Sequence, residues 1–321
     1  MHTAPLLEVR DLAVHFGPPA RPVRAVNGVS FAVQPGEVVA LVGESGSGKS
    51  VTALSIARLL PEPQARYVSG SIVVGGVDVL RASPAEVRAL RGSRVAYVFQ
   101  EPSAALNPVF TIGFQIDEVL RTHQPKADRE AERVRLLRAV GLEDAERVAR
   151  AYPHELSGGM QQRAVIAMAL AGRASLLVAD EPTTALDVTV QAQVLQVLMD
   201  VQRAEGMGLL FITHNLGLVK RIAHRVLVMY AGQLVEAGAV AEVLRAPRHP
   251  YTKALLRAVP RLRGRVAKLE GIPGTVPAAS AYSEGCRFHS RCPHAETRCR
   301  AEAPAWSEDD GVRCHLWRNL T

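Results

Sequence analysis

The sequence predicts an α/β fold built on a mainly parallel sheet. Short apolar runs of strand type alternate along the chain with stretches whose apolar residues recur at helical spacing. The clearest case is the apolar run Val38–Val42, which is followed by the glycine-rich stretch Gly43–Ser50 and then by a helical pattern over residues 51–60. Because a parallel strand pair needs a crossover connection, usually a helix, this alternation favours a parallel sheet.

The other elements follow in chain order. Alternating apolar and polar residues predict an antiparallel pair of strands at Leu6–Phe16 and Val23–Val33. Further strands are expected at residues 70–80, 95–99, 176–181, 209–213, 225–230 and 233–236. Helices are expected at residues 84–90, within 112–150, from the glycines near 158 to 173, and at 190–204, 216–223 and 249–259. Residues 101–108 are expected to form a proline-bounded loop, and 261–281 a linker.

Composition indicates a globular chain with ample core. The 321 residues are 48% hydrophobic and 21% charged, which leaves room for one large domain with an appendage or for two domains. No apolar run approaches the roughly 18 residues of a membrane span. The first residues lack the basic and apolar regions of a signal peptide. We therefore expect a cytoplasmic chain whose membrane contact is peripheral.

The positive charge is concentrated in the last quarter of the chain. The net charge is +7, and residues 246–321 hold 13 Lys and Arg against 7 Asp and Glu. Such a tail suits an acidic membrane surface or nucleic acid, and a solvated basic surface is an equally good interpretation.

The stretch Gly43–Ser50 matches the phosphate-binding pattern G-x-x-x-x-G-K-[ST]. Its glycines let backbone N–H groups turn inward around phosphate, and the following helix adds partial positive charge. Lys49 is expected to reach the β- and γ-phosphates, and the Ser50 hydroxyl to bind Mg²⁺. The alternative is a chance glycine-rich turn, which the flanking strand and helix patterns disfavour.

Polar residues follow three of the expected strands. Asp180 and Glu181 end an apolar run, so Asp180 is expected to hold Mg²⁺ and Glu181 to polarise the attacking water as general base. Taken alone, the pair would be a surface turn. Gln100 and His214 also follow strands, where strand ends converge on nucleotide, and could sense the γ-phosphate.

All four cysteines lie in the tail, with spacings of six, seven and fifteen residues between Cys286, Cys292, Cys299 and Cys314. Because a cytoplasmic chain rarely keeps disulfides, the cluster suggests a metal. We expect a [4Fe–4S] cluster, with structural Zn²⁺ or free thiols as alternatives; tight C-x₂₋₄-C pairs, usual for zinc, are absent from the sequence.

In order and spacing, these motifs resemble the nucleotide-binding subunit of ABC transporters over residues 6–245. The segment Leu156–Gln161, with its Leu-Ser-Gly-Gly sequence, is the most specific feature. The fold implied is an α/β P-loop NTPase of ABC type, with a mainly parallel sheet, an antiparallel β subdomain and a helical insert, plus a small cysteine-containing C-terminal extension. The domains implied are a nucleotide-binding domain at 1–245, with its helical subdomain at about 103–165, and an extension at 246–321.

The resemblance also implies a head-to-tail dimer with ATP between two chains. Lys49, Asp180 and Glu181 of one chain would act with Ser157 and Gly159 of the other. Gln100 would take the Q-loop role and His214 the switch role, both with Glu181 in catalysis. The implied nucleotide contacts are Phe16, Gly43, Ser45, Gly46, Gly48, Lys49, Ser50, Thr52, Gln100, Asp180, Ser157, Gly158 and Gly159, and the implied Mg²⁺ ligands are Ser50, Gln100 and Asp180. Phe16 stands where Tyr is commoner in the family, and Met160 where many members have Gln.

A finer resemblance is to the ATPases of oligopeptide, dipeptide and nickel importers. It is carried by Gln100–Pro108, His249–Leu256 and Gly285–Phe288. It implies an ATP-hydrolysing subunit that powers peptide import, with nickel or another small solute as the alternative. The implied partners are two transmembrane permeases, a second ABC ATPase in a heterodimer and, indirectly, an extracytoplasmic binding protein. The place implied is the cytoplasmic face of the cell membrane.

A nucleic-acid-associated ABC ATPase is the rival class. Between Lys49 and Leu156 there is room only for a small helical insert, and the chain carries a single phosphate-binding loop. We therefore expect no nucleic-acid partner.

Overall fold

The computed structural model describes residues 4–184, 186–258 and 271–320. Within these ranges the chain forms two compact units. Unit 1 comprises residues 4–7, 33–37 and 73–211, and unit 2 comprises residues 8–32, 38–72 and 212–320. Strands alternate with helices in both, which confirms the predicted α/β class.

The strands of unit 1 are β6 (Val95–Val98), β7 (Leu176–Asp180) and the first part of β8 (Gly208–Thr213). β6 and β7 pair in parallel, and β8 follows β7 in the strand order. Nearly every side chain of β7 and β8 is buried. A parallel sheet covered on both faces has this burial, which explains why both segments are continuous apolar runs.

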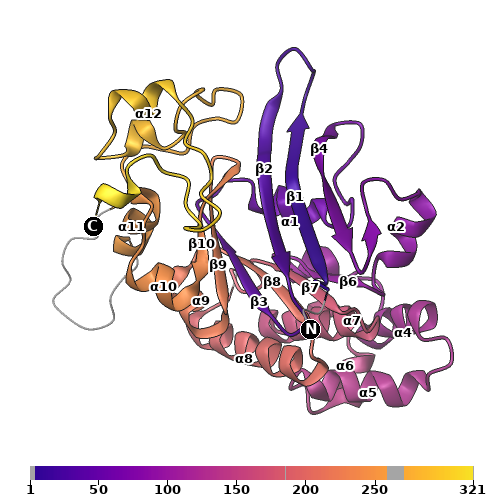
Figure 1. The fold of residues 1–321 in the computed structure, drawn as a ribbon. Coiled ribbons are helices and arrows are strands. Elements are labelled where there is room, and N and C mark those ends of the chain that lie inside the picture. The colour runs from indigo at the N-terminus through magenta and orange to yellow at the C-terminus, as the bar shows by residue number, and fades with distance from the viewer. Residues whose placement is uncertain (1–3, 185, 259–270, 321) are drawn as a thin grey trace. The chain divides into compact units, whose positions relative to one another are not determined.

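Unit 1 contains most of the helices. They are α2 (Pro84–Leu90), α3 (Pro102–Ala105), α4 (Ile112–His123), α5 (Arg129–Ala139), α6 (Ala145–Arg150), η1 (Pro153–Glu155), α7 (Gly158–Ala171) and α8 (Val188–Glu205). Helix α7 contacts α4, α5 and α8 (Figure 1). The helical stretch predicted at 112–150 is three helices, because the Asp128 and Asp144 carboxylates cap new helix starts.

Two predictions for residues 65–108 need correction. The single strand expected at 70–80 is a hairpin of β4 (Ala65–Val74) and β5 (Val77–Asp78). Gly75 and Gly76 both have positive φ, at 53° and 87°, and this reverses the chain between the strands. The expected loop at 101–108 contains the short helix α3.

The strands of unit 2 are β1 (Leu7–Phe16), β2 (Val23–Val33), β3 (Val38–Val42), β9 (Arg225–Tyr230) and β10 (Gln233–Ala239). β1 lies between β2 and β4. β3 pairs in parallel with β9, and β9 pairs antiparallel with β10 across the turn Ala231–Gly232. The predicted hairpin at this turn is therefore confirmed.

The helices of unit 2 are α1 (Lys49–Ser55), α9 (Leu216–Ile222), α10 (Val240–Arg245), α11 (Pro250–Arg257) and α12 (Thr297–Ala301), with 3-10 turns η2 (His289–Arg291) and η3 (Trp317–Asn319). Helix α1 ends five residues before the predicted position, Leu60. Arg58 has φ +48°, in the left-handed region, so the chain cannot continue as a right-handed helix there.

The C-terminal region is anchored on the β9–β10 hairpin. The Glu236 carboxylate on β10 accepts the backbone N–H groups of Arg248 at 2.7 Å and His249 at 2.9 Å, which places the start of α11. Burial lowers the pKa of His249 to about 3, so its ring is neutral and accepts the N–H of Tyr251 at 3.0 Å. Residues 311–313 bond to the outer edge of β10, a common way to cover an exposed strand edge.

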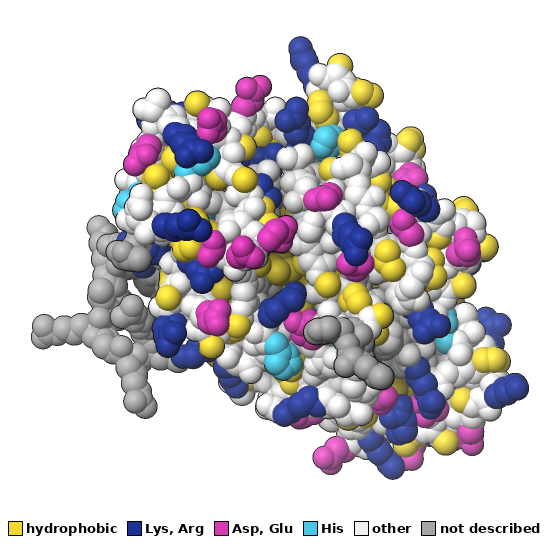
Figure 2. Space-filling model, viewed as in Figure 1, with side chains coloured by type: hydrophobic (Ala, Val, Ile, Leu, Met, Phe, Trp, Pro, Cys, Tyr) yellow, Lys and Arg dark blue, Asp and Glu magenta, His cyan; other side chains and the backbone are white. Residues whose placement is uncertain are grey.

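The tail carries both signs of charge. On the face shown in Figure 2, Lys and Arg side chains of the described residues are interspersed with Asp and Glu side chains.

Of the linker predicted at 261–281, residues 261–270 lie outside the described residues, and 271–281 contain no helix or strand. Among the described helices, none is long and apolar enough to cross a membrane.

We expect Gly172→Ala to lower the free energy of unfolding by about 1–3 kcal/mol, the usual cost of overpacking. A Cβ at Gly172 would lie 1.9 Å from the carbonyl oxygen of Gly92, so backbone has to move. The matched control is Gly271→Ala, where a Cβ meets no atom within 4 Å. Urea unfolding of the purified variants measures both; equal midpoints would contradict the packing described here.

Candidate nucleotide-binding site

The loop between β3 and α1 has the conformation that its glycines allow. Gly43, Gly46 and Gly48 have φ of 158°, 77° and 102°. A Cβ at Gly43 would lie 2.2 Å from the carbonyl oxygen of Met229, and one at Gly48 would lie 2.5 Å from that of Ala25. Side chains at either position are therefore excluded, and the loop backbone lies directly against its neighbours.

Lys49 spans this loop from its C-terminal end. Its Nζ donates to the carbonyl oxygens of Gly43 at 2.9 Å and Glu44 at 3.0 Å, and the residue is only 5% exposed. A cation in this position lies beside the backbone that is predicted to surround phosphate. The predicted residue Thr52 is buried, and its hydroxyl donates to the carbonyl of Gly48 at 3.0 Å.

The tip of the loop is open to solvent, whereas Ser47 beside it is fully buried. Ser45 and Gly46 are exposed at its tip, and Ser50 is exposed in the first turn of α1. Hydroxyl and carboxylate oxygens are the donors that Mg²⁺ prefers, so the chemistry of Ser50 and Asp180 fits that ion.

Two more predicted residues belong to unit 2. Phe16 ends β1 and is half-buried. His214 is exposed directly after β8, and Asn215 beside it caps α9 by accepting the N–H of Gly217 at 2.9 Å. Both stand at strand ends, as predicted.

In unit 1, Asp180 ends β7 and Glu181 follows it with φ +46°. This left-handed backbone is unusual for a residue other than glycine, and such strain costs about 1–3 kcal/mol. Thr184 donates from its hydroxyl to the Glu181 carboxylate at 2.8 Å. The left-handed backbone therefore turns the chain out of the line of the strand at Glu181.

The Leu-Ser-Gly-Gly segment forms the start of α7. Ser157 caps the helix by accepting the N–H of Met160 at 3.4 Å, and Ser157 and Gly158 are exposed. A Cβ at Gly159 would lie 2.4 Å from the Val190 side chain, so a larger residue there would have to displace Val190. Gln161 donates to the carbonyls of Pro153 at 2.8 Å and Leu156 at 3.2 Å, which fixes the segment from behind. Gln100, also in unit 1, is exposed after β6.

Sequence patterns missed the residues that hold the loop from outside. The N–H of Glu44 donates to the hydroxyl of Tyr251, and the Glu44 carboxylate pairs with Arg291. Tyr251 lies in a stretch that carried the family resemblance, but its spacing gives no sign of a contact with the loop. An unexplained acidic residue inside a phosphate-binding loop was the one available signal.

The prediction of an iron–sulfur cluster or zinc at the four cysteines is not supported. Among the described residues, no three His, Cys, Asp or Glu side chains are arranged to hold a metal ion. Burial, with a smaller contribution from the nearby thiols of Cys314, Cys299 and Cys292, raises the pKa of Cys286 to about 11.

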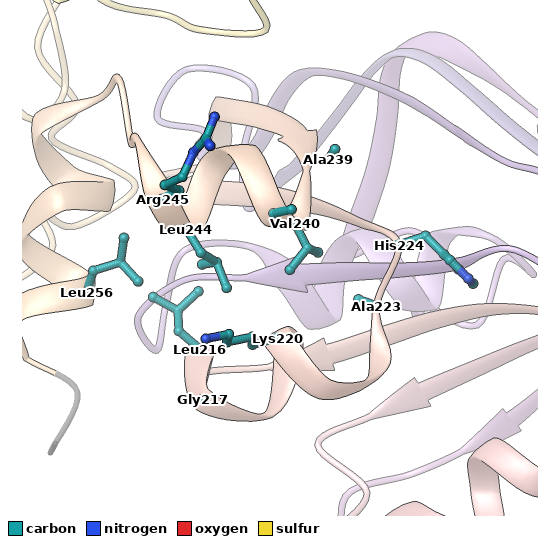
Figure 3. A pocket seen from close by; sticks show the side chains of 11 residues that line it. Leu216, Gly217, Lys220, Ala223, His224, Ala239, Val240, Leu244, Arg245 and Leu256 are labelled. Carbon is teal, nitrogen blue, oxygen red and sulfur yellow. The ribbon is translucent and has the colours of Figure 1, made fainter. Parts of the chain in front are cut away.

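A hollow in unit 2 is lined by none of the loop residues. It has a volume of about 790 Å³ and is formed by α9, α10 and α11 (Figure 3). Its lining is mainly aliphatic, with Lys220, His224 and Arg245 at its polar positions, and includes no residue of Gly43–Ser50.

A glycine loop joining a buried parallel strand to a helix, with a lysine folded across it, defines a nucleotide-phosphate-binding protein. Two family models match the chain: "ABC transporter" over residues 26–184 and "Oligopeptide/dipeptide transporter, C-terminal region" over residues 235–299.

Relatives match over nearly the whole chain. A putative peptide import ATP-binding protein of Brucella ovis is 51% identical, covering 100% of this chain and 99% of the relative. The dipeptide transport ATP-binding protein DppD of Escherichia coli is 49% identical, covering 94% and 92%. The chain therefore belongs to the ATP-binding subunits of ABC peptide importers.

Solved structures agree with the fold. The ATP-binding cassette MJ0796, as a dimer in a post-hydrolysis state bound to ADP and Pi, matches with a TM-score of 0.64 and 26% identity, covering 73% of this chain and 98% of that one. The predicted ABC-type fold is thereby confirmed.

We expect the alkylation rate of Cys286 in the reduced, metal-free chain to rise about tenfold per pH unit up to about pH 11, because only the thiolate reacts. In the urea-unfolded chain the rate should level off near the ordinary thiol pKa of about 8.5. Mass spectrometry of iodoacetamide-treated peptides measures both. A plateau below pH 9 in the folded chain would contradict the burial of this thiol.

Proposed function

We propose that this chain hydrolyses ATP to power the import of dipeptides or oligopeptides through a membrane ABC transporter. The observation that carries the proposal is the similarity of the whole chain, C-terminal region included, to proteins named as peptide or dipeptide transport ATP-binding proteins. The exposed tip of the phosphate-binding loop and its buried lysine support ATP as the bound nucleotide.

The loop residues Gly43–Ser50 surround the β- and γ-phosphates with backbone N–H groups, and Lys49 exchanges its carbonyl partners for phosphate oxygens. Phe16 stacks on the base. Ser157, Gly158 and Gly159 of a second chain close over the γ-phosphate, and the exposure of Ser157 and Gly158 at the start of α7 supports this role.

Mg²⁺, when bound, neutralises charge that develops on the phosphates. Ser50, Gln100 and Asp180 are the residues proposed to hold it. Glu181 orients the attacking water and takes its proton, and His214 and Gln100 sense the γ-phosphate. The proposal includes no metal at the cysteines, because the described thiols are not arranged as a ligand set.

Transport requires partners that this chain does not contain. We propose two transmembrane permeases and a second ABC ATPase, related rather than identical, at the cytoplasmic face of the membrane. ATP binding closes the ATPase dimer and hydrolysis reopens it, and the loop after Gln100 transmits the motion to a permease. A solute-binding protein outside the membrane acts on the permeases.

We expect Glu181→Gln to lower turnover by about 100- to 10,000-fold, the usual contribution of a general base. ATP binding should persist, and the dimer should become stable because its release by hydrolysis is blocked. Phosphate release and light scattering with ATP measure the two effects. Glu205→Gln, on the exposed end of α8, is the matched control and should behave as wild type. Single-turnover hydrolysis by Glu181→Gln at the wild-type rate would rule out this role.

A pull-down of the tagged chain from detergent-solubilised membranes tests the transporter assignment. We expect two polytopic permeases and a second ATPase, and the ligand of the associated binding protein then separates peptide from nickel or another small solute. Recovery with nucleic acid and without permeases would overturn the assignment.

A further inference from the structure

The C-terminal region holds the carboxylate of Glu44, the second residue of the phosphate-binding loop. Its partner is Arg291 in η2, 247 positions further along the chain. The guanidinium donates from Nη1 to Oε2 at 2.6 Å and from Nη2 to Oε1 at 3.0 Å. Two parallel bonds of this kind fix both the direction and the plane of the pair.

All three nitrogen atoms of the Arg291 guanidinium donate hydrogen bonds. Its Nε donates to the carbonyl of Pro273 at 2.7 Å, Nη2 donates to that of Ile272 at 3.3 Å, and Nη1 donates to the Tyr230 hydroxyl at 3.4 Å. The Arg291 side chain is only 4% exposed. A charge this buried is costly without its partner, so Glu44 and Arg291 hold each other in place.

The backbone of Glu44 is held by the same region. Its N–H donates to the hydroxyl of Tyr251 on α11 at 2.9 Å. Tyr251 is fully buried and packs against Tyr230 and Phe288, with ring centroids 4.6 Å and 5.4 Å away. Because Phe288 directly precedes η2, one aromatic cluster joins α11 and η2 to the end of β9.

The other side of this loop segment faces Lys49. The lysine donates to the carbonyls of Gly43 and Glu44, while Tyr251 and Arg291 bind the N–H and carboxylate of Glu44. A shift of η2 or α11 would therefore displace the same backbone that orients the lysine predicted to bind phosphate.

We propose that the C-terminal region positions the phosphate-binding loop through Arg291 and Tyr251, so that its folding and nucleotide binding are thermodynamically coupled. This rests on the proposed ATP binding at the loop. Arg291 acts through Glu44 and is a positioning residue. Coupling is reciprocal: if the docked region favours the nucleotide-binding conformation of the loop, then nucleotide stabilises the docked region.

The first test is nucleotide affinity. We expect Arg291→Met to weaken binding of a non-hydrolysable ATP analogue about tenfold, within the usual range for coupled sites. The matched control is Arg298→Met, which removes an exposed pair with Glu302 in the same region and should bind as wild type. Glu44→Gln should also weaken binding, and the double variant Glu44→Gln, Arg291→Met should be no weaker than Arg291→Met alone, because both remove one interaction.

The second test reads the coupling in reverse. In wild type, the nucleotide analogue should slow hydrogen exchange of backbone amides in residues 284–300. In Arg291→Met this slowing should be lost although the protein is saturated with nucleotide. A purely structural role for Arg291 would change exchange with and without nucleotide by the same factor.

The outcomes separate the two proposals. If wild type and Lys49→Ala bind the analogue equally, the proposed function fails. If Lys49→Ala loses binding while Arg291→Met and Glu44→Gln bind as wild type, the loop binds nucleotide but the positioning proposal is wrong. Should Arg291→Met fail to fold, Tyr251→Phe and Glu44→Gln decide in its place, because each removes one contact with little change in volume.

Discussion

The close approach of the loop backbone to the end of β9 is the constraint on which the candidate site depends. No side chain fits at Gly43, since a Cβ would lie 2.2 Å from the Met229 carbonyl. The turn after β9 also reaches the loop, because Gly232 donates its N–H to the carbonyl of Ser47 at 2.8 Å. The hairpin therefore fixes the loop before any ligand arrives, which reduces the ordering cost of binding.

The candidate residues in unit 1 are positioned by a different structural feature. Its candidate residues stand where regular elements end: Asp180 closes β7, Gln100 follows β6 and Ser157 caps α7. Strand and helix ends leave polar backbone unpaired and side chains exposed, so they suit ligand contacts without loss of core. Among the candidate residues described in unit 1, Glu181 alone has a left-handed backbone, which is the kind of strain that functional sites retain.

Local patterns predicted most elements, and they placed the candidate site residues in the loop and at element ends, where the structure has them, because strands and phosphate-binding loops are encoded by neighbouring residues. They missed what local spacing cannot encode. Helix α1 stops early at the turn through Arg58. The contact of Arg291 with Glu44 joins distant segments, and a buried ion pair looks in sequence like two surface charges. The cysteine prediction relied on composition, and the thiols are not placed as a metal would require.

The anchoring of the C-terminal region limits which segments this chain could exchange with its relatives by recombination. Glu236 on β10 sets the start of α11, and Tyr230 at the end of β9 touches both Tyr251 and Arg291. The β9–β10 hairpin therefore contacts both the C-terminal extension and the phosphate-binding loop. An extension transferred to another cassette would lose its contacts unless Glu44 and the β9–β10 hairpin were transferred with it. Recombination between relatives is therefore expected to succeed when Glu44, the β9–β10 hairpin and the C-terminal extension all come from the same parent.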